Sequence, residues 1–413
     1  MAALGFAWSM AAECAGQTAP KPGDAAAAPV AGSPVANATS VVRLDLDRDA
    51  AWQTVVDKEA GVYLGHVSTV LLDDGRTILA AYPKGHGKGP IVLKRSEDGG
   101  KTWSPRLPVP ESWATSLETP TLFRVGKSER GESLILFSGL YPVRAARSAD
   151  GGRTWTELAP IGEFGGIVAM GGLAATGGAG DGKFAAFFHD DGRFFGAKGK
   201  ATGTFTLYQT DTADAGTTWS APRAIWSGSD IHLCEPGVVV SPDGKTIALL
   251  LRENRRVKNS HVMFSTDKAA TWSAPVELPA ALTPLTGDRH IGAYAKDGRL
   301  VVTFRCMAKD DPWKGDWVAW VGSWDDLARV APGTAAPGQS RHGPPPSAPK
   351  YLVRLKDNLT SWDCAYAGLE SLADGTLVST TYGTWAVGEQ PSILSVRFTL
   401  AELDAMANEV PSP

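Results

Sequence analysis

One eight-residue pattern occurs four times in this chain: a hydroxyl residue, Asp, Gly and Thr stand at alternate positions, and Trp follows the Thr directly. The copies occupy residues 96–103, 148–155, 212–219 and 265–272, with starts 52, 64 and 53 residues apart and Ala269 replacing Gly in the last. Asp and Ser side chains bond nearby backbone groups in tight turns, where Gly accepts a positive φ. The pattern predicts a repeat protein of roughly 50-residue units. We expect the motif tryptophans to be buried at equivalent positions: Trp103, Trp155, Trp219 and Trp272.

Between the motifs, short β-rich runs flank Asp-Gly pairs, as at Asp74-Gly75, Asp243-Gly244, Asp297-Gly298 and Asp374-Gly375. Asp-Gly between apolar runs is a strong hairpin signal. Six strand-rich units follow, near residues 61–103, 118–155, 164–219, 234–272, 288–325 and 362–400. The predicted fold is all-β, a six-bladed β-propeller of four-stranded antiparallel blades. The segment Val41–Leu46 is expected to supply the outer strand of the last blade and so to close the ring.

Composition excludes several classes of function. The formal net charge of −4 provides no global positive field for a nucleic-acid backbone. No run of eighteen apolar residues occurs, so no membrane span is predicted. The four cysteines form no metal-like pair or disulfide framework, and Cys234, Cys306 and Cys364 are expected to be buried thiols. No metal site or cofactor is predicted.

The N-terminal region differs from the rest of the chain. Residues 1–40 combine an apolar, Ala-rich start with a stretch rich in Ala, Pro and Gly, which is typical of a leader followed by a flexible linker. We therefore expect a propeller over residues 41–405, a short tail over 406–413, and a secreted or periplasmic protein. The sequence makes no prediction about the oligomeric state.

A shared register identifies candidate site residues. Eight residues before the Asp of the four Asp-Gly turns stand His66, Glu235, Arg289 and Tyr366, and Glu118 takes the matching place in the second unit. Equal offsets on equivalent strands imply equal positions, because strand register is strict. The innermost strands of a propeller line its axis, so these side chains are predicted to meet at one mouth of the ring.

The second strand of each unit returns to the same mouth, where it brings further polar residues. Arginines at the ends of apolar strands are costly unless they meet an anion. The candidates at or beside this position are Lys84, His86, Arg252, Arg305 and Tyr382. Together with the axial residues they predict a polar binding site.

The four motifs resemble the Asp-box of sialidases and related β-propellers, over about residues 60–400. The run from Glu235 to Arg252 is similar to the family's Glu strand, and the run from Ala365 is similar to the strand that bears its nucleophilic Tyr. The family's first Arg is replaced here by His66. No Asp occupies its acid/base loop, where His86 is the substitute.

The resemblance implies an exo-acting glycoside hydrolase that removes sialic acid or a related carboxylated sugar from a glycan. Tyr366 is the implied nucleophile, and Glu235 its base; a Tyr hydroxyl titrates near pH ~10 and needs a base to act. His86 and His66 complete the catalytic candidates. The substrate-binding candidates are Arg252, Arg289 and Arg305, which are expected to hold the sugar carboxylate, with Glu118, Lys84, Asp363 and Tyr382.

Two alternatives remain from the sequence. His66, His86, Tyr366 and Arg289 would also suit a polysaccharide lyase or a His-dependent glycosidase on uronate- or rhamnose-containing glycans. A non-catalytic carbohydrate-binding propeller would instead need aromatic platforms, for which Trp113, Trp313, Trp317 and Trp385 are candidates.

Overall fold

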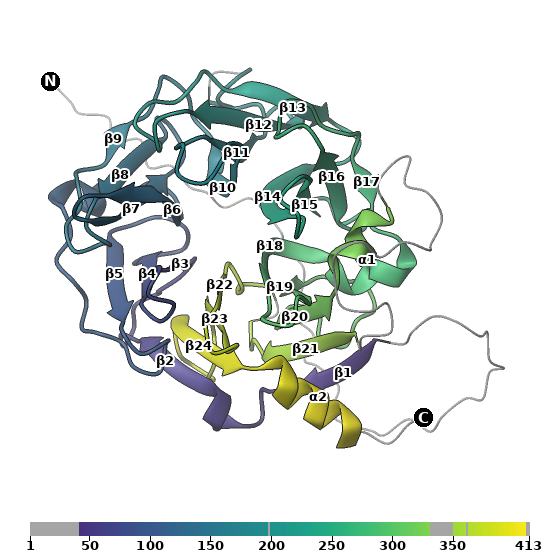
Figure 1. The fold of residues 1–413 in the computed structure, drawn as a ribbon. Helices are drawn as coiled ribbons and strands as arrows, with labels where there is room; N and C mark the ends of the chain where they lie inside the picture. Colours follow the sequence, from purple (N-terminus) through teal and green to yellow (C-terminus); the bar gives the residue numbers. More distant parts are fainter. Residues whose placement is uncertain (1–40, 197–198, 331–349, 361, 410–413) are drawn as a thin grey trace, which may run out of the picture. The chain divides into compact units, whose positions relative to one another are not determined.

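The computed structural model describes residues 41–196, 199–330, 350–360 and 362–409, all within a compact unit that spans Thr39–Pro413. The predicted leader and linker, and part of the predicted tail, lie outside the described residues. In the described part the strands form six sheets, and Figure 1 shows them around a common axis. Innermost strands of neighbouring sheets are in contact all round, including the last with the first, which closes the ring. The predicted six-bladed propeller is confirmed.

Blades 2, 3 and 4 each contain four antiparallel strands in chain order. Blade 2 comprises β6 (Pro120–Ser128), β7 (Gly131–Ser138), β8 (Arg144–Ser148) and β9 (Ala159–Pro160). Blade 3 comprises β10 (Ile167–Ala175), β11 (Phe184–Asp190), β12 (Phe205–Thr212) and β13 (Arg223–Gly228). Blade 4 comprises β14 (Leu233–Val240), β15 (Ile247–Glu253), β16 (His261–Ser265) and β17 (Val276–Glu277).

The other three blades depart from this plan. Blade 1 has three strands, β3 (Ser68–Leu71), β4 (Ile78–Pro83) and β5 (Ile91–Ser96). Blade 5 has β18 (Gly287–Tyr294), β19 (Leu300–Cys306), β20 (Trp317–Gly322) and β21 (Tyr351–Lys356), with β1 (Val42–Asp45) as a fifth, parallel strand. Blade 6 has β22 (Gly368–Ser371), β23 (Leu377–Gly383) and β24 (Ser392–Phe398), and β2 (Gln53–Asp57) is its antiparallel outer strand.

The ring is therefore closed by a different segment from the one predicted. Val41–Leu46 was expected to complete the last blade, but β1 pairs with β21 of blade 5, and β2 completes blade 6. The apolar pattern of residues 41–46 correctly indicates an outer strand. It does not distinguish between the exposed edges of two neighbouring sheets.

Few helices occur in the described residues. The 3₁₀ turns are η1 (Ala50–Trp52), η2 (Glu111–Thr115) and η3 (Ala280–Leu285), and the α-helices are α1 (Trp324–Ala328) and α2 (Leu400–Glu409). Helix α2 crosses the predicted boundary at residue 405, and Met406 packs on the core between blades 5 and 6. No helix among the described residues is long and apolar enough to span a bilayer.

The four motifs form the same turn after the third strand of blades 1 to 4, and we call them the Asp turns. In each, the first hydroxyl donates to the Asp Oδ1 at 2.8–2.9 Å. The Thr hydroxyl donates to Oδ2 at 2.5–2.7 Å. Ala269 adopts a φ of 64° in the fourth copy, so the hydrogen bonds hold the left-handed conformation even without Gly.

The motif tryptophans occupy equivalent places, but they are half-buried rather than buried as predicted. Each packs on the edge of an apolar cluster: Trp103, Trp155, Trp219 and Trp272. The turns lie at the ends of third strands, where an indole covers the core on one face only. The expectation for Cys234, Cys306 and Cys364 is confirmed, since all three are buried free thiols.

Candidate functional site at the axial mouth

Five of the six innermost strands have a residue in a strained backbone conformation near their first residues. His66, Val168, Glu235, Arg289 and Ala365 have φ between 50° and 64°. A left-handed conformation costs of order 1–3 kcal/mol for such side chains and is concentrated at functional sites. His66, Glu235 and Arg289 therefore share one position, as the common offset predicted. In blade 6 the strained residue is Ala365, so Tyr366 stands one residue further along its strand.

Tyr366 and Glu235 are joined directly. The Tyr366 hydroxyl donates a hydrogen bond to Glu235 Oε1, and Arg252 Nη1 donates to the same oxygen at 2.6 Å. Arg252 Nη1 also lies 3.4 Å from the Tyr366 hydroxyl oxygen. Glu235 Oε2 is buried with no hydrogen-bond partner among the described residues. The Tyr–Glu pair that the sequence predicts is thus assembled, with one carboxylate oxygen left for another group.

Asp288 organises the arginines of the mouth. This fully buried carboxylate lies 3.2 Å from Arg252 Nε, pairs with Arg256, and accepts from Arg305 Nε at 2.8 Å. Its pKa lies well below the ordinary value, because three guanidinium groups outweigh the effect of burial. Arg252 and Arg305 are therefore already paired with a carboxylate of the protein. This pairing leaves them less able to bind a substrate carboxylate.

Arg289 is bound differently from the other arginines. Its Nη1 donates to the backbone carbonyl of Gly171, and no carboxylate among the described residues forms an ion pair with it. It is buried, and burial lowers its pKa, while Glu235, Tyr366 and Glu118 act on it electrostatically in the opposite sense. Arg289 thus provides a buried positive charge that no carboxylate in the described part of the chain pairs.

The pKa values of two carboxyl groups at the mouth are shifted in opposite directions. Burial raises the pKa of Glu118 to about 8, although Val168 N donates to its Oε2 at 2.6 Å. For Glu235, burial acts upward, but Arg252 and the Tyr366 hydroxyl leave the pKa below its ordinary value. Glu118 is therefore mainly protonated at neutral pH and Glu235 is ionised. Glu118 thus adds little negative charge to the mouth.

A second group of polar residues adjoins Tyr366. His66 lies with its ring centroid 4.5 Å from that of Tyr366 and 4.6 Å from that of Tyr382. Gly87 N donates to His66 Nδ1 at 3.0 Å, and His66 Nε2 lies 3.3 Å from the Tyr382 hydroxyl. Burial places the pKa of His66 well below 6.5. His66 is thus neutral, with both ring nitrogens engaged, and the contacts suit a positioning role.

Asp363 anchors this second group. It accepts from the hydroxyls of Tyr382 at 3.0 Å and Tyr63 at 2.8 Å, and His86 Nε2 lies 3.3 Å from its Oδ1. Burial opposes its ionisation, but His86 and the two hydroxyls lower its pKa to about 2. The His86 side chain is 62% exposed. The structure thus pairs an accessible histidine with a fixed carboxylate close to Tyr366.

Lys84 is the predicted residue whose contacts lie elsewhere. Its Nζ pairs with Glu59 at 2.9 Å, and Arg106 joins the same carboxylate. Arg106 also pairs with Asp57 of β2, so this group joins the first blade to the outer strand of blade 6. Among the described contacts none connects Lys84 to Tyr366, Glu235 or the arginines.

Sequence reasoning missed Asp288 and Arg256. Asp288 directly precedes Arg289 and so lies one residue outside the register that His66, Glu235 and Arg289 share. The signal was present, since Asp288-Arg289-His290 puts three polar residues at the start of an apolar strand. Arg256 follows β15 in a loop, where a shared register gives no information.

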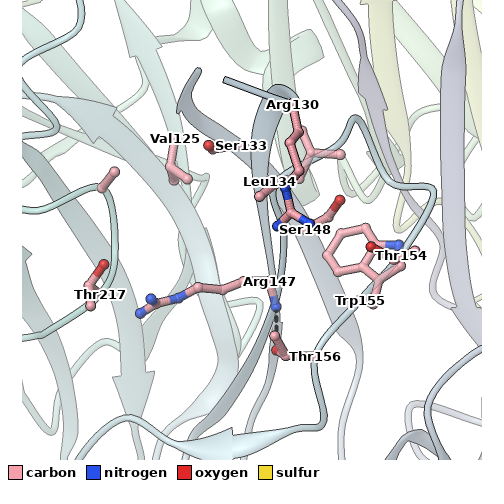
Figure 2. A pocket seen from close by; sticks show the side chains of 12 residues that line it. Val125, Arg130, Ser133, Leu134, Arg147, Ser148, Thr154, Trp155, Thr156 and Thr217 are labelled. Atoms are coloured by element: carbon pink, nitrogen blue, oxygen red, sulfur yellow. Dashed lines mark hydrogen bonds between the residues drawn. The ribbon is translucent and has the colours of Figure 1, made fainter. Parts of the chain in front are cut away.

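Two cavities are lined by other residues, and the second adjoins the site through Gly171, whose carbonyl accepts from Arg289. One, of about 320 Å³ (Figure 2), is bordered by the Asp turns of blades 2 and 3, and Arg147 crosses it to donate to the Gly216 carbonyl. The other, of about 350 Å³, is apolar, and its lining runs from Phe123 through β10 and β14 to Tyr294 of β18. Neither contains a titratable pair comparable to Tyr366 and Glu235.

No protein-family model and no curated protein matches the chain. Solved structures do. A protein of unknown function from Dyadobacter fermentans is 15% identical, with a TM-score of 0.59 over 84% of this chain and 97% of that one. The Penicillium chrysogenum α-L-arabinanase complexed with arabinobiose is 15% identical, with a TM-score of 0.55 over 85% and 98%. The NanB sialidase of Streptococcus pneumoniae is 12% identical, with a TM-score of 0.54 over 85% and 71%. At these identities the likeness establishes the fold.

Proposed function

We propose that this chain is a glycoside hydrolase that acts at the axial mouth on a glycan bearing an anionic sugar. The observation that carries the proposal is the hydrogen bond from the Tyr366 hydroxyl to Glu235, with Arg252 on the same carboxylate oxygen. A neutral hydroxyl beside an ionised carboxylate is a nucleophile with its base in place. Fold likeness to an arabinanase and a sialidase supports the reaction class by analogy.

The reaction proceeds in two steps in this proposal. The Tyr366 oxygen attacks the anomeric carbon while Glu235 takes the phenol proton, and Arg252 stabilises the developing negative charge. His86, held by Asp363, protonates the departing glycosidic oxygen. In the second step His86 removes a proton from water, and the water oxygen attacks the anomeric carbon. The bond from that carbon to the Tyr366 oxygen breaks, and Glu235 returns the proton to this oxygen. The glycan is cleaved by net addition of one water.

An anionic substrate follows from the charge balance at the mouth. Four guanidinium groups face three carboxylates that are ionised at neutral pH, Glu235, Asp288 and Asp363, which leaves one positive charge in excess. Because Arg252, Arg256 and Arg305 are engaged by these carboxylates, Arg289 is proposed as the principal partner of the anionic group. A guanidinium fork suits a carboxylate or sulfate. The sequence predicts that Arg252, Arg289 and Arg305 bind the carboxylate together. In this proposal Arg289 binds the anionic group directly, and Arg252 and Arg305 support it.

A product screen tests the reaction class. Purified protein is incubated with sialyllactose, digalacturonate, a rhamnogalacturonan oligosaccharide and, as a neutral reference, arabinobiose. A new reducing end without near-ultraviolet absorbance is expected from an anionic member of the panel. An absorbing, unsaturated product would identify a lyase instead, and binding without turnover would identify a carbohydrate-binding propeller.

The roles of Tyr366 and Glu235 are tested on the substrate so found. Tyr366→Phe and Glu235→Gln should each lower kcat by ~10²–10⁴. Tyr294→Phe is the matched control, because it also removes one hydroxyl, which donates to the Val240 carbonyl in the adjoining blade. Full activity of Tyr366→Phe, or an equal loss in Tyr294→Phe, contradicts the assignment.

A further inference from the structure

One large aromatic side chain beside the mouth is exposed. Trp362 is 65% exposed, whereas Trp113, Trp317 and Trp320 are fully buried. Indole groups are usually highly buried, so exposure of this size calls for a reason. Trp362 lies in the connection from β21 to β22, which also carries Asp363 and Tyr366.

The backbone of Trp362 is fixed although its indole is exposed. Arg305 Nη1 donates to the Trp362 carbonyl, and Arg305 is itself held by Asp288 at 2.8 Å. The next residue, Asp363, accepts from Tyr63 and Tyr382 and faces His86. The backbone that carries the indole is therefore held both by the Asp288–Arg305 pair and by the group around Asp363. No aromatic ring among the described residues contacts the indole itself.

We infer that Trp362 is the stacking platform for the sugar on the leaving-group side of the scissile bond. The inference rests on the proposed function, in which His86 protonates the glycosidic oxygen. The departing sugar is attached to that oxygen, so it lies beside His86 and Asp363, where Trp362 stands next in the chain. The face of an indole is apolar and complements the C–H face of a sugar ring, and such aromatic surfaces provide much of the lining of ligand sites.

Trp362 is not among the tryptophans that the sequence analysis predicts as platforms for a sugar. Of the four tryptophans considered as platforms, Trp113 and Trp317 are fully buried, and Trp313 and Trp385 are half-buried. The guanidinium groups of Arg43 and Arg354 pack on Trp313, at 4.8 and 5.5 Å from its ring centroid. Trp362 therefore presents the most accessible indole of these five.

The experiment compares substrates that differ only in the leaving group. Trp362→Ala and Trp362→Phe are assayed with sialyllactose against sialyl fluoride, and with digalacturonate against galacturonosyl fluoride. Fluoride has no ring to stack, so it reports the reaction without the platform. Val55→Ala, which changes a 59% exposed side chain on the outer strand β2, is the control.

Trp362→Ala should lower kcat/KM for the disaccharide by roughly 5- to 10-fold, the worth of one aromatic stacking contact. It should leave the fluoride unchanged, and Trp362→Phe should restore most of the loss. An equal loss on fluoride and disaccharide, or no loss on either, overturns the inference.

Failure of the proposed function is distinguishable from failure of this inference. If wild-type protein turns over neither compound of a pair, the proposed hydrolase activity is wrong, and calorimetric titration with sialyllactose and digalacturonate then tests the platform alone. Weaker binding by Trp362→Ala than by wild type supports the platform. Equal affinity of the two proteins, or no binding by either, overturns it.

Discussion

The Asp turns and the axial mouth both recur from blade to blade, but different features recur in each. Each Asp turn keeps its side chains from blade to blade, and its hydrogen bonds recur with nearly constant lengths. At the mouth the backbone recurs instead, with a left-handed residue at the start of most inner strands, while the side chains change: His66, Val168, Glu235 and Arg289. A repeat that conserves side chains maintains the fold, and a repeat that conserves only backbone geometry can bring different chemical groups together.

Arginine shows the same contrast. Between the outer turns, arginines tie one blade to the next through backbone carbonyls: Arg95 donates to Gly151 at 3.0 Å, Arg147 to Gly216, and Arg223 to Ala269. At the mouth, three arginines converge on the carboxylate of Asp288, and Arg289 donates to the Gly171 carbonyl. Changes at the mouth should therefore leave buried charges unpaired, and changes at the turns should only remove hydrogen bonds.

The largest effect on stability is expected from Asp288→Asn. Removing one partner from a buried ion-pair group leaves charges uncompensated and typically costs about 3–5 kcal/mol. Urea unfolding of the variant should show this loss, and activity should fall as well, because Arg252 and Arg305 lose their common anchor. Glu389→Gln, which breaks a surface pair with Lys58, should cost at most about 1 kcal/mol. Similar losses in both variants would remove the distinction between mouth and surface.

Asp150→Ala tests the outer region. The Asp150 carboxylate accepts hydrogen bonds from the Ser148 and Thr154 hydroxyls and from the backbone of Arg153 and Thr154. Losing an acceptor of this kind should cost about 2 kcal/mol, measured as a lower urea midpoint. The kcat of the folded fraction should not change. A selective loss of kcat would mean that the turn reaches the site.

The sequence predicts most of the fold, because the features that specify it are local. The Asp turns and the Asp-Gly hairpins indicate six blades, and equal offsets place His66, Glu235 and Arg289 at one axial position, with Tyr366 one residue further along its strand. What it does not predict depends on contacts between distant segments. The choice of β2 rather than Val41–Leu46 for blade 6 is of this kind, as is the capture of Arg252 and Arg305 by Asp288.

Glu118 gives the mouth a pH dependence that the Asp turns lack. Its pKa rises from the ordinary 4.5 to about 8 through burial. A raised carboxyl pKa adds stability below pH 4.5, and that contribution is lost as pH rises towards 8, because the unfolded chain releases the proton first. Wild type should therefore lose stability relative to Glu118→Gln between pH 5 and about 8, as read from urea midpoints. In contrast, the pKa of Asp150 is held at about 2, so the turn stays ionised throughout. Parallel curves for the two proteins would contradict the burial of Glu118.

The smallest effect is expected from the ties between blades. Arg147 lies directly before the Asp turn of blade 2 and donates to the Gly216 carbonyl in the Asp turn of blade 3, across the cavity of Figure 2. Arg147→Met keeps most of the side chain but removes the donor, so the cost should be one hydrogen bond, about 0.5–1.5 kcal/mol. Arg147→Lys should lose less, since an ammonium can still donate to a carbonyl. Arg153→Met is the matched control, because Arg153 donates to the Asp150 carbonyl within its own turn and ties no second blade. Hydrogen exchange at the facing strands of blades 2 and 3 should rise in Arg147→Met and not in Arg153→Met, with kcat unchanged in both. Faster exchange confined to blade 2 would show that the arginine supports its own turn and not the contact between blades.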